Sequence, residues 1–514
     1  MAAKEWVQRL YAAGIGVSLL GLPFSNWLMS QGAFLCVLAW GVDRAVNGPL
    51  FRGRGWRFYR LQAPLLAILA LWGWHALGVI WSEDMAEGLN VLRIKAPLLV
   101  FPLVLITGRW ERERVFRWLP WAWWAALVAG SLAVLGQGFR SEGPLAPRDW
   151  SPFVSHIRLS LFLAFGIAWS WGQTLQRRAP LLPSILLFVL GGAVIWKTAA
   201  LTGALLLPVV GLLLAALVGF DRLGVPLAWS RRGAVGAVAI GLGFAVVGAW
   251  NLRAVTPDAA DLPTHSEAGT PYAHYPDRTL REGDEFVWVK LAEREMRSEW
   301  NGRSALDFDG ADGRGQELKM TVIRYLTSLG LPKDSAGVAA LSPAQIAHIE
   351  AGIPTRFEFD HSGLRRRWDV LKFEVMNAWD GGNPSGHSVV QRLHFMEAAG
   401  WIRQRAPIWG VGTGDLNREF AAAYEALDSP LAPEFRLRAH NQYVSFLLAG
   451  GPLALVFWVA VLVLSARGLP REQRVPAWMF LAILALSCFT EDTLETQAGV
   501  TFAGLFLGLF GLRR

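Results

Sequence analysis

Cysteine is almost absent from this chain, which has only two among its 514 residues. Cys36 and Cys488 each lie inside a long apolar run. Two isolated thiols can supply neither a disulfide framework nor a cysteine zinc site. We therefore expect both cysteines to be packing residues that face lipid or the protein core.

Charged residues are also scarce. Asp, Glu, Lys and Arg make up 18% of the chain and hydrophobic residues 53%, whereas charged residues make up about 25% of soluble domains. A soluble protein of this length needs more polar residues to cover its surface. The net charge of +8 is no sign of nucleic-acid binding, because the charges lie between apolar runs. The composition predicts an all-α integral membrane protein.

Twelve apolar runs are candidate membrane spans, since a bilayer core needs roughly 17–25 mostly apolar residues per helix. They cover residues 10–24, 27–44, 63–81, 92–107, 117–137, 157–173, 182–197, 199–220, 234–252, 443–466, 475–490 and 496–512. We expect residues 21–26 to form a tight turn between the first two spans. No Ala-x-Ala cleavage pattern follows the first run, so we expect it to remain as a helix.

The distribution of Lys and Arg predicts the orientation of these spans. If the N-terminus is cytoplasmic and the spans alternate, most basic residues of the short loops fall on the inner side, as the positive-inside rule requires. The short outer loops and helix ends then carry only Arg93, Lys95, Arg140, Arg148, Arg158 and Lys197. Both termini are predicted to be cytoplasmic.

One long polar insertion separates the ninth and tenth spans. It predicts three regions: residues 1–252 with spans 1–9, a mainly helical periplasmic domain at 253–442, and residues 443–514 with spans 10–12. Long outer domains cross the membrane largely regardless of their charge. Helical patterns in the insertion cover residues 284–300, 316–329, 342–351, 364–379 and 387–405.

The predicted spans contain almost no ionisable side chains. His75 lies in the third span, and we expect it to be a hydrogen-bonded packing residue. Carriers that move protons or ions usually need titrating or coordinating groups inside the membrane. The twelve spans therefore do not by themselves favour a transporter.

Polar chemistry is predicted to collect at the outer face instead. Lys95, Arg158 and Lys197 fall near outer helix ends, and Arg392 and His440 lie in the polar insertion. Each cation alone could simply extend to the membrane surface or pair with the loop. Together they predict a site for an anionic group at the membrane surface, such as a lipid-linked phosphate or diphosphate.

Two segments of the insertion carry the strongest signals. A predicted helix with Arg392 is followed by the glycine-rich stretch Gly410-Val-Gly-Thr-Gly414, which allows close backbone approach. The stretch lacks the Lys-Ser/Thr of a Walker motif, so it is weak evidence for phosphate binding by itself. His440-Asn-Gln-Tyr443 stands directly before the tenth span, and without further information His440 could equally cap that helix.

These motifs and the span layout resemble the bacterial O-antigen ligase family, within the group that includes O-antigen polymerases and protein O-oligosaccharyltransferases. The matching pieces are the Arg392 helix with Gly410–Gly414, His440–Tyr443, the late outer loop, and Ser155-His-Ile-Arg158 at the sixth span. The resemblance covers essentially the whole chain. Two positions depart from the family pattern: the Arg expected near Thr202 is missing, and Ala449 and Gly450 replace a Glu.

The resemblance implies an inverting, metal-independent, GT-C-like glycosyltransferase without a cofactor, located in the bacterial inner membrane with its active site on the periplasmic face. Its partners would be an undecaprenyl-diphosphate-linked glycan donor, a lipid A–core acceptor and membrane lipids. His440 would be the base, and Arg392 would act beside it as a catalytic residue. The substrate-binding residues would be Lys197, Arg158, Lys95, Asn441, Tyr443 and His156.

Three other functions remain open. A repeat-unit polymerase or a protein O-oligosaccharyltransferase would share the donor chemistry and differ in the acceptor. A lipid-linked oligosaccharide flippase would instead place its cations along a path open to both sides of the membrane.

The stretch Asp307–Gly313 does not match an EF-hand calcium loop, because Ala311 and Asp312 stand where Asp or Asn and then Gly are required. We therefore expect a solvated loop.

Overall fold

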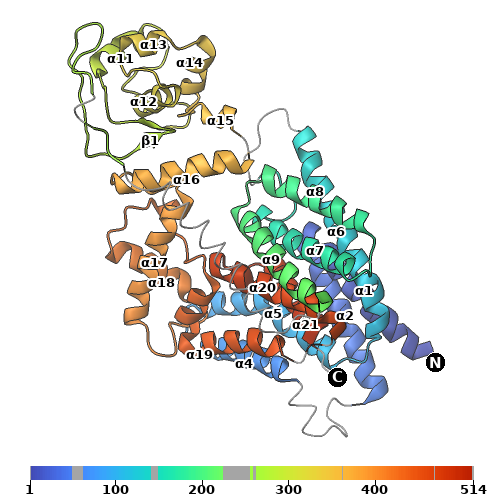
Figure 1. Cartoon of the computed structure of the whole chain (residues 1–514). Helices are drawn as coiled ribbons and strands as arrows, with labels where there is room; N and C mark the ends of the chain where they lie inside the picture. Colours follow the sequence, from blue (N-terminus) through green and yellow to red (C-terminus); the bar gives the residue numbers. More distant parts are fainter. Residues whose placement is uncertain are drawn as a thin grey trace. The chain divides into compact units, whose positions relative to one another are not determined.

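The computed structural model describes residues 2–48, 62–140, 149–223, 255–258, 262–361, 363–467, 469 and 471–511 (Figure 1). The described chain is mainly helical and has almost no sheet. It divides into two compact units. Unit 1 comprises residues 1–242, 395–429 and 436–514, and unit 2 comprises residues 243–394 and 430–435. These units divide the chain at other places than the three predicted regions.

Each predicted span within the described residues falls on one helix of unit 1. These helices are α1 (Ala2–Phe24), α2 (Asn26–Asn47), α4 (Ala63–Gly78), α5 (Met85–Thr107), α6 (Arg112–Arg140), α7 (His156–Leu175), α8 (Leu181–Lys197), α9 (Leu201–Leu223), α19 (Gln442–Ser465), α20 (Arg474–Thr490) and α21 (Gln497–Gly511). The predicted span 234–252 lies outside the described residues. Among the described helices, α1 from Lys4, α5, α6 and α19 are long and apolar enough to cross a membrane. These four helices indicate a membrane protein.

Two predicted boundaries are wrong. The expected turn at 21–26 shrinks to Ser25, which accepts a hydrogen bond from the Leu28 amide and caps α2. The fourth helix begins at Met85 instead of residue 92, because Asp84 caps it by accepting from the Glu87 amide. Lys95 therefore lies about three turns inside α5 rather than at its end.

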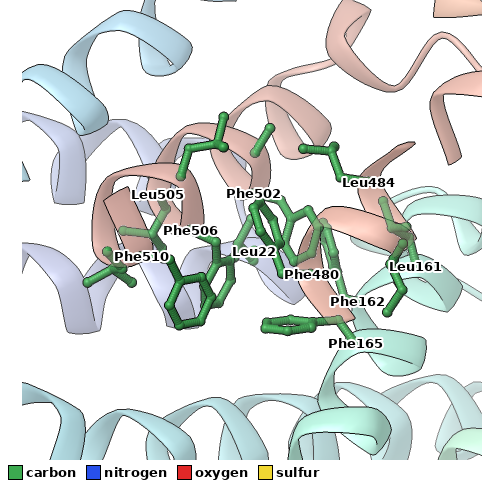
Figure 2. Close-up of a cluster of buried hydrophobic side chains, with 14 of the residues drawn as sticks. Leu22, Leu161, Phe162, Phe165, Phe480, Leu484, Phe502, Leu505, Phe506 and Phe510 are labelled. Carbon is green, nitrogen blue, oxygen red and sulfur yellow. The ribbon is translucent and has the colours of Figure 1, made fainter. Parts of the chain in front are cut away.

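The core of unit 1 is built around α21. Every described side chain of α21 from Ala498 to Gly511 is buried, which is typical of a helix surrounded by others. Figure 2 shows phenylalanines of α7, α20 and α21 packed in one cluster; the Phe165 and Phe506 rings meet edge to face with their centroids 4.9 Å apart. Gly504 lies so close to α5 that an added Cβ would meet the Pro97 carbonyl oxygen at 2.2 Å. Small residues thus let α5 and α21 pack closely.

Unit 2 has its own core, and its sequence-predicted helices are largely confirmed. They appear as α11 (Glu293–Asn301), α12 (Leu318–Leu329), α14 (Pro343–Glu350) and α16 (Gly363–Trp379), with two shorter helices α13 (Ser335–Ala339) and α15 (Phe357–Asp360). Helix α17 (Ser388–Arg405) runs from unit 2 into unit 1, where α18 (Leu416–Ala426) follows. The prediction of helix from residue 284 is wrong, because β1 (Arg281–Glu282) and β2 (Glu285–Phe286) form an antiparallel hairpin there.

The Asp307–Gly313 stretch is largely the solvated loop that the sequence predicts, because five of its seven residues are exposed. Asp312 is buried, and its carboxylate accepts from the Arg314 and Gln316 amides and the Thr321 hydroxyl. Asp309 forms an ion pair with Arg297. The Asp312 carboxylate thus closes a turn within a loop that is otherwise exposed.

Candidate functional site

The predicted motif His440–Tyr443 forms the start of α19. Asn441 is the N-cap residue, and its side-chain oxygen accepts from the Tyr443 and Val444 amides. His440, directly before it, has a φ of 47°. Few residues other than glycine adopt this left-handed conformation, in which His is one of the more frequent exceptions. The conformation turns the chain from the extended segment 436–439 into the helix.

His440 faces two carboxylates from the connection between α20 and α21. Its Nδ1 lies 3.9 Å from Glu491 Oε2 and 4.0 Å from Asp492 Oδ2. Its ring lies 5.6 Å from that of Phe395, and a third of its side chain is exposed. The imidazole is thus held between an aromatic ring and negative charge while one part of it stays accessible.

The connection at residues 491–495, called the acidic turn below, also binds Lys95. Lys95 Nζ lies 2.5 Å from Glu495 Oε1, and both side chains are almost fully buried. Gln442 donates to the same oxygen at 2.9 Å and accepts from the Leu494 amide. Burial alone would raise the pKa of Glu495, but the charges of Lys95 and Arg438 outweigh it and lower the pKa to about 2. Glu495 is therefore ionised at neutral pH.

Arg158 fastens α7 to the same turn. Its guanidinium donates to the Asp492 carbonyl oxygen at 3.0 Å and to the Thr496 hydroxyl at 3.1 Å, and the residue is 7% exposed. The Ser445 hydroxyl of α19 donates to the Asp492 carboxylate at 2.8 Å. The starts of α7, α19 and α21 and the end of α20 therefore meet at the acidic turn, together with Lys95 of α5.

The remaining predicted binding residues make different contacts. The Tyr443 hydroxyl donates to the Ala485 carbonyl oxygen within α20, and Asn441 donates to the Phe489 carbonyl oxygen. His156 is the first residue of α7 and is partly buried. Lys197 is exposed at the end of α8, 5.7 Å from the Trp150 ring. No contact joins Lys197 to the acidic turn within the described residues.

Arg392 lies in the part of α17 that belongs to unit 2, and its side chain is partly buried. His387, which precedes α17, and His394 within it belong to unit 2 as well. Within the ranges that the structure describes, no cluster of three or more His, Cys, Asp or Glu residues could hold a metal ion.

The glycine-rich stretch 410–414 packs against protein backbone. Its amides from Val411 to Gly414 donate in turn to the Leu448, Ala449 and Gly78 carbonyl oxygens and to the Ser82 hydroxyl. Helix α19 is broken at Gly450 and Gly451, before Pro452, so nearby carbonyls lose their helical partners. The stretch supplies donors to these carbonyls, and its amides are therefore not available to cradle a phosphate.

The sequence did not identify the acidic turn or Arg438 as parts of the site. Glu491, Asp492 and Glu495 stand in the short gap between two apolar runs, where acids are ordinary loop residues. Three carboxylates in a gap of five residues, within an otherwise acid-poor region, were the available signal. Without the tertiary structure nothing paired them with Lys95, a residue 400 positions earlier.

The comparisons with known proteins add no assignment. No family model matches the chain, and no curated protein matches its sequence. The resemblance to O-antigen ligases therefore rests on the short motifs and the predicted layout of spans.

Proposed function

We propose that this protein is a membrane-embedded glycosyltransferase of the O-antigen ligase type. It transfers a glycan from undecaprenyl diphosphate to a sugar hydroxyl of lipid A–core, without a metal ion, at the periplasmic face of the bacterial inner membrane. The observation that carries the proposal is the placement of His440, a partly exposed imidazole beside two carboxylates where several helix ends meet.

In the proposed reaction the acceptor hydroxyl oxygen forms a bond to the anomeric carbon from the face opposite the diphosphate. The bond between that carbon and the diphosphate oxygen breaks, and undecaprenyl diphosphate leaves with the bonding electron pair. His440 takes the hydroxyl proton. The imidazole accepts the proton as a general base. The negative charges of Glu491 and Asp492, which lie 3.9 and 4.0 Å from Nδ1, stabilise the imidazolium that forms.

The cations divide into two groups in this proposal. Lys197 contacts the diphosphate of the donor in this proposal, and Arg392 of unit 2 remains the second diphosphate contact that the sequence motifs predict. Lys95 and Arg158 make close contacts with the acidic turn, which favours a role in holding that turn at the site. Asn441 and Tyr443 fix the start of α19 and so set the direction of His440.

The meeting of helix ends supports the proposed twelve-span topology. With alternating crossings and a cytoplasmic N-terminus, the starts of α5, α7, α19 and α21 and the end of α20 all fall on the outer side. The contacts of Arg158, Gln442 and Asn441 bring the ends of α7, α19, α20 and α21 together, and Lys95 joins them from about three turns inside α5. The proposal therefore places the acidic turn and His440 at the periplasmic boundary of the membrane.

A lipid-linked oligosaccharide flippase is the second candidate. It is favoured by the broken helix α19 and by the buried Lys95–Glu495 pair, because interrupted helices and buried charges are features of carriers. The flippase would use the same lipid-linked glycan but would form no new glycosidic bond.

Loss of the gene, followed by gel analysis of lipopolysaccharide, separates these functions. A ligase loss leaves core-only lipopolysaccharide and accumulates long-chain glycan on undecaprenyl diphosphate in the periplasm. A polymerase loss leaves caps of a single repeat, and a flippase loss leaves lipid-linked repeats on the cytoplasmic side. The control is the deletion strain in which expression of the gene is restored. Normal lipopolysaccharide after gene loss would exclude the ligase function.

A further inference from the structure

Arg438 lies two residues before His440 and is held only loosely. Its one partner among the described residues is Glu495, whose Oε2 lies 3.8 Å from Arg438 Nη1. That distance is longer than a hydrogen bond. A quarter of the Arg438 side chain is exposed. Its five N–H donors thus remain available for a ligand.

The neighbouring cations have their donors engaged. Lys95 is 3% exposed and binds Glu495 Oε1 at 2.5 Å, which already neutralises that carboxylate. Arg158 is 7% exposed and donates to the acidic turn and Thr496. Lys95, Arg158 and Arg438 together balance the three carboxylates of the acidic turn, and Arg438 is the one of these cations that makes no hydrogen bond within the described residues.

The position of Arg438 relative to His440 suits one shared ligand. Residues 436–439 have no helical structure and lead directly into His440. Arg438 and His440 both reach the acidic turn, the first at Glu495 and the second at Glu491 and Asp492. Arg438 also lines a small cavity with Ser445 and Glu495 at the start of α19.

We infer that Arg438 binds the diphosphate of the lipid-linked donor and positions it beside His440. This inference rests on the proposed function. A guanidinium offers two parallel N–H donors that match phosphate oxygens, and this match is closer than an ammonium can make. Glu495 keeps Arg438 at the site when no donor is bound, and Lys95 keeps Glu495 neutralised when Arg438 turns to the diphosphate.

The test is the binding of undecaprenyl diphosphate to the purified full-length chain in detergent. Removing one partner of a desolvated charge pair lowers the binding affinity strongly. Arg438→Ala should therefore weaken the binding of undecaprenyl diphosphate by about 30-fold or more. Arg438→Lys should lose part of the affinity, because it keeps the charge without the paired donors. Arg438→Ala should weaken the binding of undecaprenyl monophosphate less than the binding of the diphosphate.

Arg436→Ala is the matched control, because it removes the same charge from the same segment. Arg436 donates to the Ser429 carbonyl oxygen, so its loss should leave diphosphate affinity unchanged. Arg438→Gln keeps a donor near Glu495 and serves if the alanine variant fails to fold, as judged by thermal unfolding.

The outcomes separate the inference from the proposed function. Wild-type affinity for the diphosphate in both Arg438→Ala and Arg438→Gln overturns the inference, whatever the chain catalyses. If the Arg438 variants bind the diphosphate more weakly than wild type, but the wild-type chain transfers no glycan, the inference is supported and the ligase function is excluded. A wild-type chain that does not bind undecaprenyl diphosphate overturns both.

Discussion

His440 combines an unusual backbone with a charged environment. Its φ of 47° is left-handed, and its Nδ1 lies 3.9 Å from Glu491 and 4.0 Å from Asp492. A residue that only caps a helix does not need this conformation, since Asn441 already fills the N-cap position. The geometry therefore favours a chemical role for His440 over the structural one that the sequence left open.

Replacing His440 should abolish most turnover without unfolding the protein. Asn tolerates left-handed φ values better than most residues, so His440→Asn keeps the backbone while it removes the base. Loss of a general base typically lowers the rate by about 10²–10⁴-fold. Turnover and thermal unfolding should be measured together, with the exposed His265→Ala as control. Near-normal turnover in His440→Asn would remove His440 from the mechanism.

At the scale of elements, the Lys95–Glu495 pair ties α5 to the acidic turn. Removing one partner of a buried pair leaves the other charge uncompensated and typically costs about 3–5 kcal/mol. Glu495→Gln should therefore lower the thermal stability of the detergent-solubilised protein at pH 7. Lys95→Met combined with Glu495→Gln should recover part of the loss, because no buried charge then remains. A double variant as unstable as the sum of both single variants would contradict this coupling.

The same pair predicts a pH dependence. The pKa of Glu495 is lowered to about 2 in the folded protein, so its stabilising contribution is present above the unfolded pKa of about 4.3. It is lost as the pH falls towards 2. The stability difference between wild type and Glu495→Gln should consequently be constant from pH 7 to 5 and should shrink below pH 4.3. A constant difference down to pH 3 would argue against the lowered pKa.

Gly410 is one of three glycines in the glycine-rich stretch, with Gly412 and Gly414, at which an added side chain would clash. Its φ is 88°, and an added Cβ would lie 2.4 Å from the Ala449 carbonyl oxygen. Strained backbone alone costs about 1–3 kcal/mol, so Gly410→Ala should destabilise the protein by at least that amount. Gly400→Ala in α17 is the control, because nothing lies within 4 Å of its added Cβ. Equal thermal stability of the two variants would show that the stretch does not hold the break in α19.

The sequence predicted elements better than it predicted the site. Apolar periodicity located the helices because burial repeats along each of them, and it located α16 to within one residue at either end. Capping by Asp84 moved the start of α5, a local hydrogen bond that hydropathy does not register. The contacts of Glu495 with Lys95 and Gln442 depend on how α5, α19 and α21 pack. Neighbouring residues in the sequence carry no sign of that packing.

At the scale of the whole molecule, the proposed topology can be tested with introduced cysteines. Cys36 and Cys488 are both fully buried, so they give little background with an impermeant thiol reagent. Ala305→Cys in unit 2 should react in intact spheroplasts, because the positive-inside rule places residues 253–442 outside. Arg114→Cys, at an exposed position in the first turn of α6, should react only after the inner membrane is permeabilised. The reverse pattern would overturn the topology.

The most direct test of the whole account is glycan transfer by the purified chain in lipid nanodiscs. The substrates are undecaprenyl-diphosphate-linked glycan and lipid A–core, EDTA is present throughout, and the readout is lipid A–core extended by the glycan. The account predicts that the wild-type chain forms this product and that His440→Asn does not. A folded wild-type chain that forms no product, or that forms it only after Mg²⁺ or Ca²⁺ is restored, would contradict the account.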